Sequence, residues 1–209
     1  MSKLLYINAD PKAEQDSYSR RLGRTFLDEV GKHSHSLEIE EINLYDKTIP
    51  MIDAEVLDAW EKMSKQEILS DSELEKIGTM EVILEQFMAA SHYVIVTPMW
   101  NFLFPPVLKS YIDCLVMAGK TFKFTEDGAV GLLQNKKMVH IQASGSRYTG
   151  TPFESLNHSD HYLRDLFSFL GVKDYQRLYV ENTHNVFQAQ DELERAKAHV
   201  GGVVQSFIA

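Results

Sequence analysis

Short apolar runs alternate along this chain with longer segments in which apolar residues recur every three or four positions. The short runs are rich in β-branched and aromatic residues and show little polar alternation, which is typical of strands covered on both faces. They lie at Leu4–Ile7, Leu37–Leu44, Tyr93–Val96, Met138–Ile141 and Leu178–Val180. Strands that alternate with helices predict βαβ units and therefore a parallel sheet.

The segments between these strands carry apolar stripes of helical period. Pro105 or Pro106 suits a first helical turn, and Gly119 and Gly171 suit helix ends. The predicted helices run over Ser19–Val30, Leu74–Met88, Pro105 or Pro106 to Gly119, Leu163–Leu170 and Leu193–Phe207.

Two segments fall outside this alternation. The polar stretch Met51–Asp71 is expected to hold a short helix, Ala54–Met63, and a mobile loop, and the sequence leaves open whether it gates a site. A small β element is expected near Thr121–Thr125. We expect residues 1–209 to form one domain, a three-layer flavodoxin-like α/β sandwich with a five-stranded parallel sheet of order 2-1-3-4-5.

The charge balance limits the partners that this chain can have. Its formal net charge of −9 argues against nucleic acid and against an anionic membrane surface. No apolar run reaches the ~20 residues of a membrane helix, and no secretory signal is expected before the first strand. Cys114 is the only cysteine, which excludes an intramolecular disulfide and a cysteine-based metal cluster. We expect a cytoplasmic protein without a bound metal.

The most informative segment follows the third predicted strand. Thr97-Pro98 ends strand pairing because proline lacks a backbone donor, and Met99–Phe102 comes next. In open α/β sheets, ligands bind at the carboxyl ends of the strands. Two aromatic side chains beside the Asn101 amide suit a flat heteroaromatic ligand with polar edges.

The connection after the first strand places Ser17 and Ser19 at the start of a helix. It holds neither G-x-G-x-x-G nor a P-loop motif, so it carries no dinucleotide fingerprint. A helix N-terminus offers free amides and a partial positive charge, and the serine hydroxyls add donors for a phosphate. The alternative is structural, with Ser17 as an N-cap and Ser19 as a surface residue.

A third loop, Ala143–Ser146, follows the strand Met138–Ile141. Its glycine permits close backbone approach and its serines supply donors, although an ordinary turn is the alternative. The loops after the first, third and fourth strands lie side by side in a doubly wound sheet. Three separate signals therefore converge on one crevice.

Two motifs, Thr97–Phe102 with Pro106–Lys109 and Gly119–Gly128, resemble those of the FMN-dependent NADH azoreductase and quinone reductase family. The likeness extends over nearly the whole chain. It implies a flavodoxin-like homodimer with one FMN per subunit at the dimer interface. It implies FMN contacts from Ser17, Tyr18 and Ser19 at the phosphate, from Pro98, Met99, Trp100, Asn101 and Phe102 at the isoalloxazine ring, and from Ala143, Ser144, Gly145 and Ser146 at the pyrimidine edge.

The resemblance also implies substrate contacts. Phe124 and an aromatic residue of the Tyr162–Phe167 helix would close over the flavin from the partner subunit, with core positions as the alternative for Phe124, Tyr162 and Phe167. His184, after the last strand, is a candidate contact to flavin or substrate, or else a solvated loop residue. Cys114 is expected to be a buried hydrophobic residue.

One departure from the family pattern concerns the phosphate. Family members often carry a serine just after the first strand, where this chain has Ala9-Asp10. The change removes a donor and brings a carboxylate close by. Either Asp10 points away from the phosphate, or FMN is held less tightly.

The resemblance implies a two-electron oxidoreductase that uses NADH to reduce quinones and to cleave aromatic azo bonds to amines by a ping-pong mechanism. No catalytic acid, base or nucleophile is needed, because the flavin supplies the chemistry. Two other functions stay open: a one-electron flavodoxin-type carrier that docks to redox proteins, and a non-catalytic sensor that has lost the ligand. The sequence does not determine the physiological acceptor or the preference for NADH over NADPH.

Overall fold

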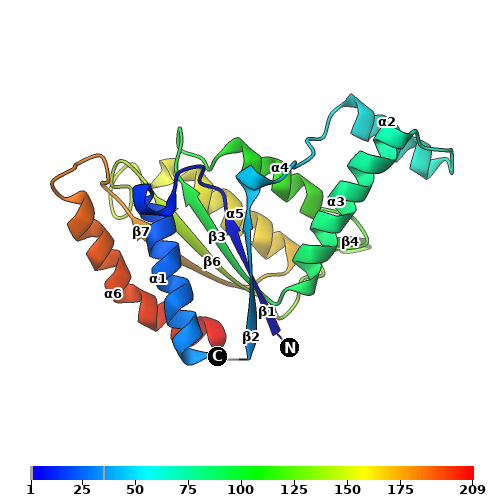
Figure 1. Ribbon diagram of the computed structural model, residues 1–209. Helices are drawn as coiled ribbons and strands as arrows, with labels where there is room; N and C mark the ends of the chain where they lie inside the picture. The colour runs from blue at the N-terminus through cyan, green and yellow to red at the C-terminus, as the bar shows by residue number, and fades with distance from the viewer. Residues whose placement is uncertain (1, 35) are drawn as a thin grey trace.

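The computed structural model describes residues 2–34 and 36–209 and is built on a five-stranded parallel sheet (Figure 1). The strand order is β2-β1-β3-β6-β7, which confirms the predicted order 2-1-3-4-5 when the strands of this sheet are counted along the chain. All neighbouring pairs in it are parallel. The strands are β1 Ser2–Asn8, β2 Leu37–Asn43, β3 His92–Pro98, β6 Lys137–Ala143 and β7 Asp174–Val180.

Helices cover both faces of this sheet (Figure 1). Val94 and Val96 of the central strand β3 pack on the side of α1 and α6, whereas Tyr93 and Ile95 pack on the side of α3, α4 and α5. Successive strand residues point to opposite faces, so both sets must be apolar. The helices are α1 Tyr18–His33, α2 Ala54–Ser64, α3 Asp71–Ala89, α4 Pro106–Leu115, α5 His158–Leu170 and α6 Ala189–Ile208, with short 3₁₀ turns at Glu14–Asp16, Leu44–Asp46 and Glu154–Leu156.

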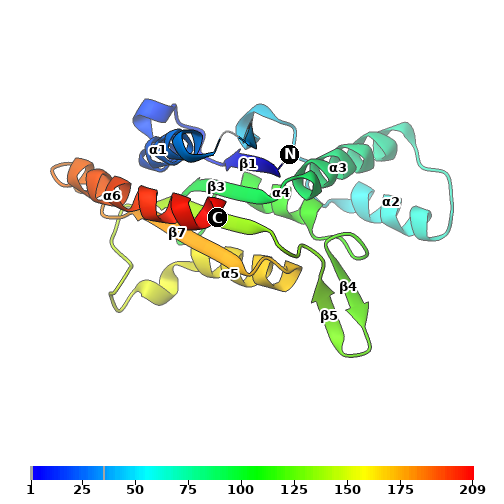
Figure 2. The same cartoon turned by 90° about the horizontal axis from the view of Figure 1, so that it is seen from below.

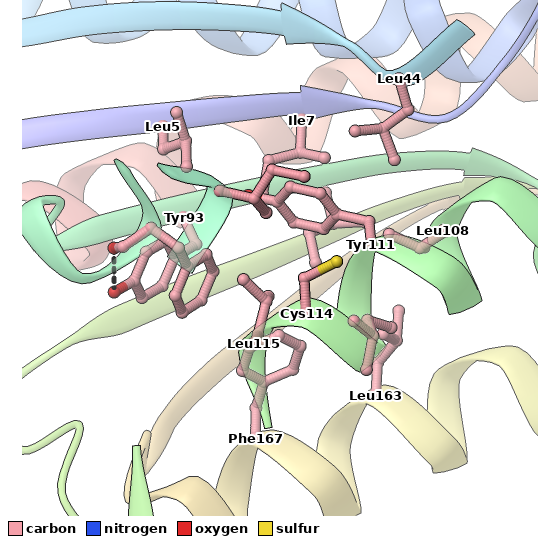
Figure 3. Close-up of a cluster of buried hydrophobic side chains, with 14 of the residues drawn as sticks. Leu5, Ile7, Leu44, Tyr93, Leu108, Tyr111, Cys114, Leu115, Leu163 and Phe167 are labelled. Carbon is pink, nitrogen blue, oxygen red and sulfur yellow. Dashed lines mark hydrogen bonds between the residues drawn. The ribbon is translucent and has the colours of Figure 1, made fainter. Parts of the chain in front are cut away.

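Figure 3 shows the core on the side of α3, α4 and α5. The rings of Phe87 and Tyr93 stack with centroids 4.0 Å apart, and the Tyr93 hydroxyl donates to the Phe87 carbonyl at 3.0 Å. Cys114 is fully buried in this cluster. Burial, assisted by the nearby charge of Asp113, raises the pKa of its thiol to about 12. A neutral, enclosed thiol serves packing, which confirms the prediction for Cys114.

The helix α4 ends at Leu115 and not at the predicted Gly119. The buried Thr121 hydroxyl donates to the Leu115 carbonyl at 2.7 Å and accepts from the Met117 amide at 3.0 Å. The Thr121 side chain therefore satisfies a carbonyl and an amide that would have formed backbone hydrogen bonds in a further helical turn. Gly119 has a φ of +83° in the turn that follows the helix.

An antiparallel hairpin takes the place of the single β element predicted near Thr121–Thr125. Its strands are β4 Phe122–Thr125 and β5 Gly128–Gly131, and it projects from the body of the molecule (Figure 2). Gly131 anchors the hairpin to the end of α5. A Cβ atom at this position would lie 2.1 Å from the carbonyl carbon of Leu170, so the close approach requires glycine.

The predicted helix within Met51–Asp71 is confirmed as α2, which projects beyond the sheet together with the start of α3 (Figure 1). The Lys62 ammonium of α2 lies 2.6 Å from the buried Glu73 carboxylate of α3. Leu74 was predicted on the buried face of α3, but it is exposed. The first turns of α3 lie beyond the sheet, and the face that packs on the core is formed by Met80, Ile83, Leu84 and Phe87.

Candidate functional site

Three loops meet at the carboxyl edge of the sheet, where the sequence predicts a ligand. They follow β1, β3 and β6, which are neighbours in the sheet. Backbone hydrogen bonds join them: the Ala9 amide donates to the Val96 carbonyl at 2.9 Å, and the Met99 amide donates to the Ala143 carbonyl at 2.8 Å. The fold therefore brings the three predicted loops to one edge (Figure 1).

The loop after β3 forms a tight turn at Trp100–Leu103, the aromatic turn. Trp100 and Leu103 exchange both backbone hydrogen bonds, at 2.7 and 3.0 Å. Asn101 and Phe102 have φ angles of 49° and 69°, the signs expected of a type I′ turn. Asparagine adopts this backbone readily, but for a bulky residue such as Phe102 it costs about 1–2 kcal/mol. Backbone strain beneath exposed aromatic rings makes the turn a candidate functional feature.

Two neighbouring elements hold the aromatic turn in place. The Phe102 carbonyl accepts from the Ser159 amide of α5 at 3.2 Å. The Phe102 ring meets the Tyr148 ring edge-on, with centroids 6.3 Å apart. The turn is therefore fixed to α5 and to the loop after β6, although its own rings remain 42% (Trp100) and 43% (Phe102) exposed.

The N-terminus of α1 carries the serines predicted to hold a phosphate. Ser17 is the N-cap, which confirms that part of the structural alternative, and its Oγ accepts from the Arg20 amide at 3.1 Å. Ser19 is fully buried, so its interpretation as a surface residue is wrong. Both hydroxyls donate to Asp10 Oδ2, at 2.6 Å from Ser17 and 3.2 Å from Ser19. Tyr18 lies half-buried beside them.

The loop Ala143–Ser146 is tied to the loop after β7. The Ser144 amide donates to the Val180 carbonyl at 2.9 Å, and the His184 amide donates to the Gly145 carbonyl at 3.0 Å. A side chain at Gly145 would meet only an ordinary contact with His184, so the packing of the chain itself does not require glycine here. The side chains of Ser146 and His184 are exposed at this edge, where a ligand can reach them.

The predicted substrate contacts have different environments. Phe167 is fully buried against Phe87, with centroids 5.9 Å apart, which contradicts a direct contact between Phe167 and a substrate. Tyr162 is partly buried and packs edge-on against Phe104 at 5.5 Å. Phe124 is 75% exposed on the hairpin, which is anchored at Leu170 at the end of α5, whereas the aromatic turn is hydrogen-bonded to Ser159 at the start of that helix. Within one chain, Phe124 therefore does not approach the carboxyl edge.

A buried polar network, which the sequence did not predict, lies on the α5 side of the sheet. His140 of β6 is fully buried, with Nε2 3.0 Å from Thr97 Oγ1 and Nδ1 3.4 Å from Asp160 Oδ1. The Tyr175 hydroxyl donates to the same carboxylate oxygen at 2.8 Å, and Arg177 lies 3.4 Å from its other oxygen. Because Thr97 immediately precedes Pro98, the network reaches the base of the loop that carries the aromatic turn. Its only sequence signal is a histidine inside an apolar strand.

The environment of Asp160 favours its ionised form. Burial raises the pKa of this carboxyl, but the hydrogen bond and charge of His140, together with the Tyr175 hydrogen bond, outweigh burial and lower the pKa well below its ordinary value. Asp160 therefore remains an anion inside the protein and anchors the network from α5.

Two kinds of feature are missing from residues 2–34 and 36–209. No group of three or more histidine, cysteine, aspartate or glutamate side chains there could hold a metal ion. No helix in these ranges combines the length and the apolar character needed to cross a membrane.

Comparisons with known proteins agree with this geometry. A family model described as a flavodoxin-like fold matches residues 2–203. The chain is 45% identical over 198 residues to the FMN-dependent NADH:quinone oxidoreductase of an Exiguobacterium species, with 95% of this chain and 91% of that protein covered. The chain belongs to the flavodoxin-like family of FMN-dependent NADH:quinone oxidoreductases.

Other members of this family match equally completely. The FMN-dependent NADH:quinone oxidoreductase of Staphylococcus haemolyticus is 42% identical, with 94% of each chain covered. The crystal structure of an FMN-dependent NADH-azoreductase from Bacillus anthracis, in complex with FMN, superposes with a TM-score of 0.94 at 40% identity and 99% coverage of both chains. These matches confirm the family resemblance predicted from the two motifs.

Proposed function

We propose that this protein is an FMN-dependent NADH:quinone oxidoreductase that also reduces aromatic azo compounds. One observation carries the proposal: the aromatic turn, the buried serines of α1 and the loop Ala143–Ser146 meet at the carboxyl edge of a sheet. The relatives named for this activity match the chain over almost their whole length, which favours an enzyme over an electron carrier or a sensor.

The residues at this edge suit FMN chemically. The hydroxyls of Ser17 and Ser19 both donate to one carboxylate oxygen, Asp10 Oδ2, so these two donors are already arranged to bind an anionic group. The N-terminus of α1 adds free amides and a partial positive charge, which favour a phosphate. The rings of Trp100 and Phe102 offer apolar surface to a flat tricyclic ring.

Bound FMN would supply the redox chemistry by accepting a hydride from NADH and passing two electrons to the acceptor. The chain itself binds and orients. Ser17, Tyr18 and Ser19 would hold the phosphate end, and the aromatic turn would fix the plane of the ring. The exposed edge around Gly145 and His184 would offer backbone donors to the polar rim and a side-chain contact to the acceptor.

We further propose that NADH and the acceptor use the same face of the site in turn. The sequence contains no glycine-rich dinucleotide fingerprint, so no separate resident site for NADH is indicated. Ping-pong kinetics follow from a shared site. A flat azo compound fits the same aromatic surface as a quinone, which accounts for both acceptors.

The proposal is tested with purified protein stripped of flavin and reconstituted with FMN. We expect NADH oxidation in the presence of a benzoquinone or an azo dye only after reconstitution, and parallel double-reciprocal plots when both substrates are varied. Protein that takes up no FMN, or that oxidises NADH equally well without it, would contradict the function. Intersecting plots would contradict only the shared site.

A further inference from the structure

We propose that Asp10 competes with the phosphate of FMN for the hydroxyls of Ser17 and Ser19, and so reduces the preference of this protein for FMN over flavins without a phosphate. The inference rests on the proposed function, because it assumes that the flavin phosphate binds at the N-terminus of α1. It assigns a specificity role to one residue that departs from the family pattern.

The carboxylate of Asp10 does not point away from the serines. Its Oδ2 accepts from Ser17 at 2.6 Å and from Ser19 at 3.2 Å, and its Oδ1 accepts from the Lys12 amide at 3.0 Å. Asp10, Ser17 and Ser19 are all buried, and Asp10 is only 3% exposed. The carboxylate therefore engages the same donors that a phosphate would need.

The backbone of Asp10 is fixed by the end of β1. Its amide donates to Asn8 Oδ1 at 3.2 Å, and its carbonyl accepts from Asn8 Nδ2 at 3.0 Å. Asn8 Nδ2 also donates to Asn43 Oδ1 of β2 at 2.9 Å. The position of Asp10 is therefore set by the sheet, so the carboxylate can leave the serines only by rotating its side chain.

Nearby cations do not neutralise this carboxylate. Within residues 2–34 and 36–209, no lysine, arginine or histidine side chain pairs with Asp10. Arg20 donates to the Lys12 carbonyl, and Arg24 pairs with Glu14 and Glu41 at 3.1 and 2.8 Å. A phosphate brought to the serines would thus meet a buried carboxylate that no side-chain cation pairs with, and like charges repel strongly in such a site.

The competition has two physical parts. Each serine hydroxyl carries one proton, and a proton directed at Asp10 is not available to a phosphate oxygen. The two anions also repel each other. Riboflavin has the same ring but no phosphate, so Asp10 should not affect its binding.

Two substitutions separate charge from shape. Asp10→Asn keeps an oxygen that can accept from the Lys12 amide, while it removes the charge and adds a donor for the phosphate. Asp10→Ser introduces a smaller donor and provides a second test if Asn disturbs the turn. Asp16→Asn is the matched control, because Asp16 lies exposed in the same connection and, unlike that of Asp10, its side chain accepts from neither serine hydroxyl.

The test is a titration of flavin-free wild-type and variant proteins with FMN and with riboflavin, followed by flavin fluorescence, with thermal unfolding to confirm that each variant folds. We expect Asp10→Asn and Asp10→Ser to lower the Kd for FMN about tenfold or more, with the Kd for riboflavin unchanged. Asp16→Asn should change neither Kd appreciably.

Several results would overturn the inference: an unchanged or weaker affinity for FMN in both Asp10 variants, an equal gain for riboflavin, or an equal gain in Asp16→Asn. The proposed function fails in a different way. Wild-type protein that binds neither flavin contradicts the function, whereas wild-type protein that binds FMN as tightly as the Asp10 variants contradicts only the role of Asp10.

Discussion

Asp160 is the residue whose charge ties the buried network together, since it contacts His140, Tyr175 and Arg177. Its pKa is lowered on folding, so it stabilises the fold above its ordinary unfolded value of about 3.9. That contribution is lost as the pH falls toward the lower folded value. We expect Asp160→Asn to reduce the free energy of unfolding by about 2 kcal/mol or more at pH 7.

Urea unfolding at pH 7 and at pH 3.5 checks this prediction. The difference between wild type and Asp160→Asn should shrink at the lower pH, because Asp160 binds a proton in the unfolded wild-type chain at pH 3.5 while it stays ionised in the folded protein, so acid favours unfolding. Equal differences at the two pH values would show that the carboxylate charge is not what stabilises the network.

Phe102 combines backbone strain with an exposed ring. Phe102→Gly should leave the free energy of unfolding unchanged or raise it by about 1 kcal/mol, because glycine adopts positive φ without steric cost. The same change should weaken FMN binding by removing apolar surface. Phe153→Gly is the control, since Phe153 is exposed with an ordinary φ of −95°. If Phe102→Gly lowered both the free energy of unfolding and the affinity for FMN, the claim that Phe102 strains the backbone while its ring serves FMN binding would be wrong.

At the scale of single residues, the sequence predicted where a residue lies in its helix or strand better than it predicted the partners of its side chain. Ser17 as an N-cap followed from its place before an apolar helical stripe. The orientation of Asp10 did not follow, because it depends on Asn8 and the sheet register. His140 was missed because its partners, Thr97 and Asp160, are distant in sequence and meet only in the folded chain.

Among the elements, α1 has the most direct effect on the phosphate end of the site. Gly23 packs it closely against the sheet: a Cβ atom there would lie 2.2 Å from the Tyr6 hydroxyl and 3.1 Å from Val96 Cγ2. Gly23→Ala should push α1 away from β1 and β3, lower the melting temperature and weaken FMN binding through displacement of Ser17 and Ser19.

A second glycine in the same helix provides the control. Nothing lies within 4 Å of a Cβ atom at Gly31, so Gly31→Ala should stabilise the protein by about 0.5–1 kcal/mol through helix propensity, with FMN affinity unchanged. Calorimetry and FMN titration measure both effects. If Gly23→Ala behaved like Gly31→Ala, the close contact would not position the site.

The elements themselves were predictable where burial on both faces makes a strand continuously apolar, as in β3. The start of β7 was missed because Asp174–Arg177 is largely polar. Tyr175 and Arg177 contact Asp160 of the buried network, and β7 itself lies at the edge of the sheet. The end of α4 depended on the Thr121 hydroxyl, which no helical pattern reveals.

For the whole molecule, several exposed apolar side chains lie on the projecting parts, α2, α3 and the hairpin. Those on these parts and on the loop between α2 and α3 include Leu57, Met63, Ile68, Leu74, Val82 and Phe124. Projecting apolar surface favours self-association. We expect a homodimer, with a mass by light scattering about twice the 23.9 kDa of the chain. A monomeric mass at all protein concentrations would contradict the predicted dimer and any contact of Phe124 with a partner's flavin.

The order of the sheet was predictable because crossover connections and the position of the site loop restrict the topology. The hairpin and the projecting segment of α2 and α3 were only partly predictable, since some of their apolar residues, among them Leu57, Leu74 and Phe124, are exposed and do not face the core of their own chain.

A crystal structure of the protein grown with FMN tests the proposed site as a whole. We predict the phosphate within hydrogen-bonding distance of Ser17 Oγ and Ser19 Oγ, with the Asp10 carboxylate rotated away from both, and the ring against the aromatic turn. A phosphate bound elsewhere, or a ring that does not contact Trp100–Phe102, would contradict the assignment of this edge as the flavin site.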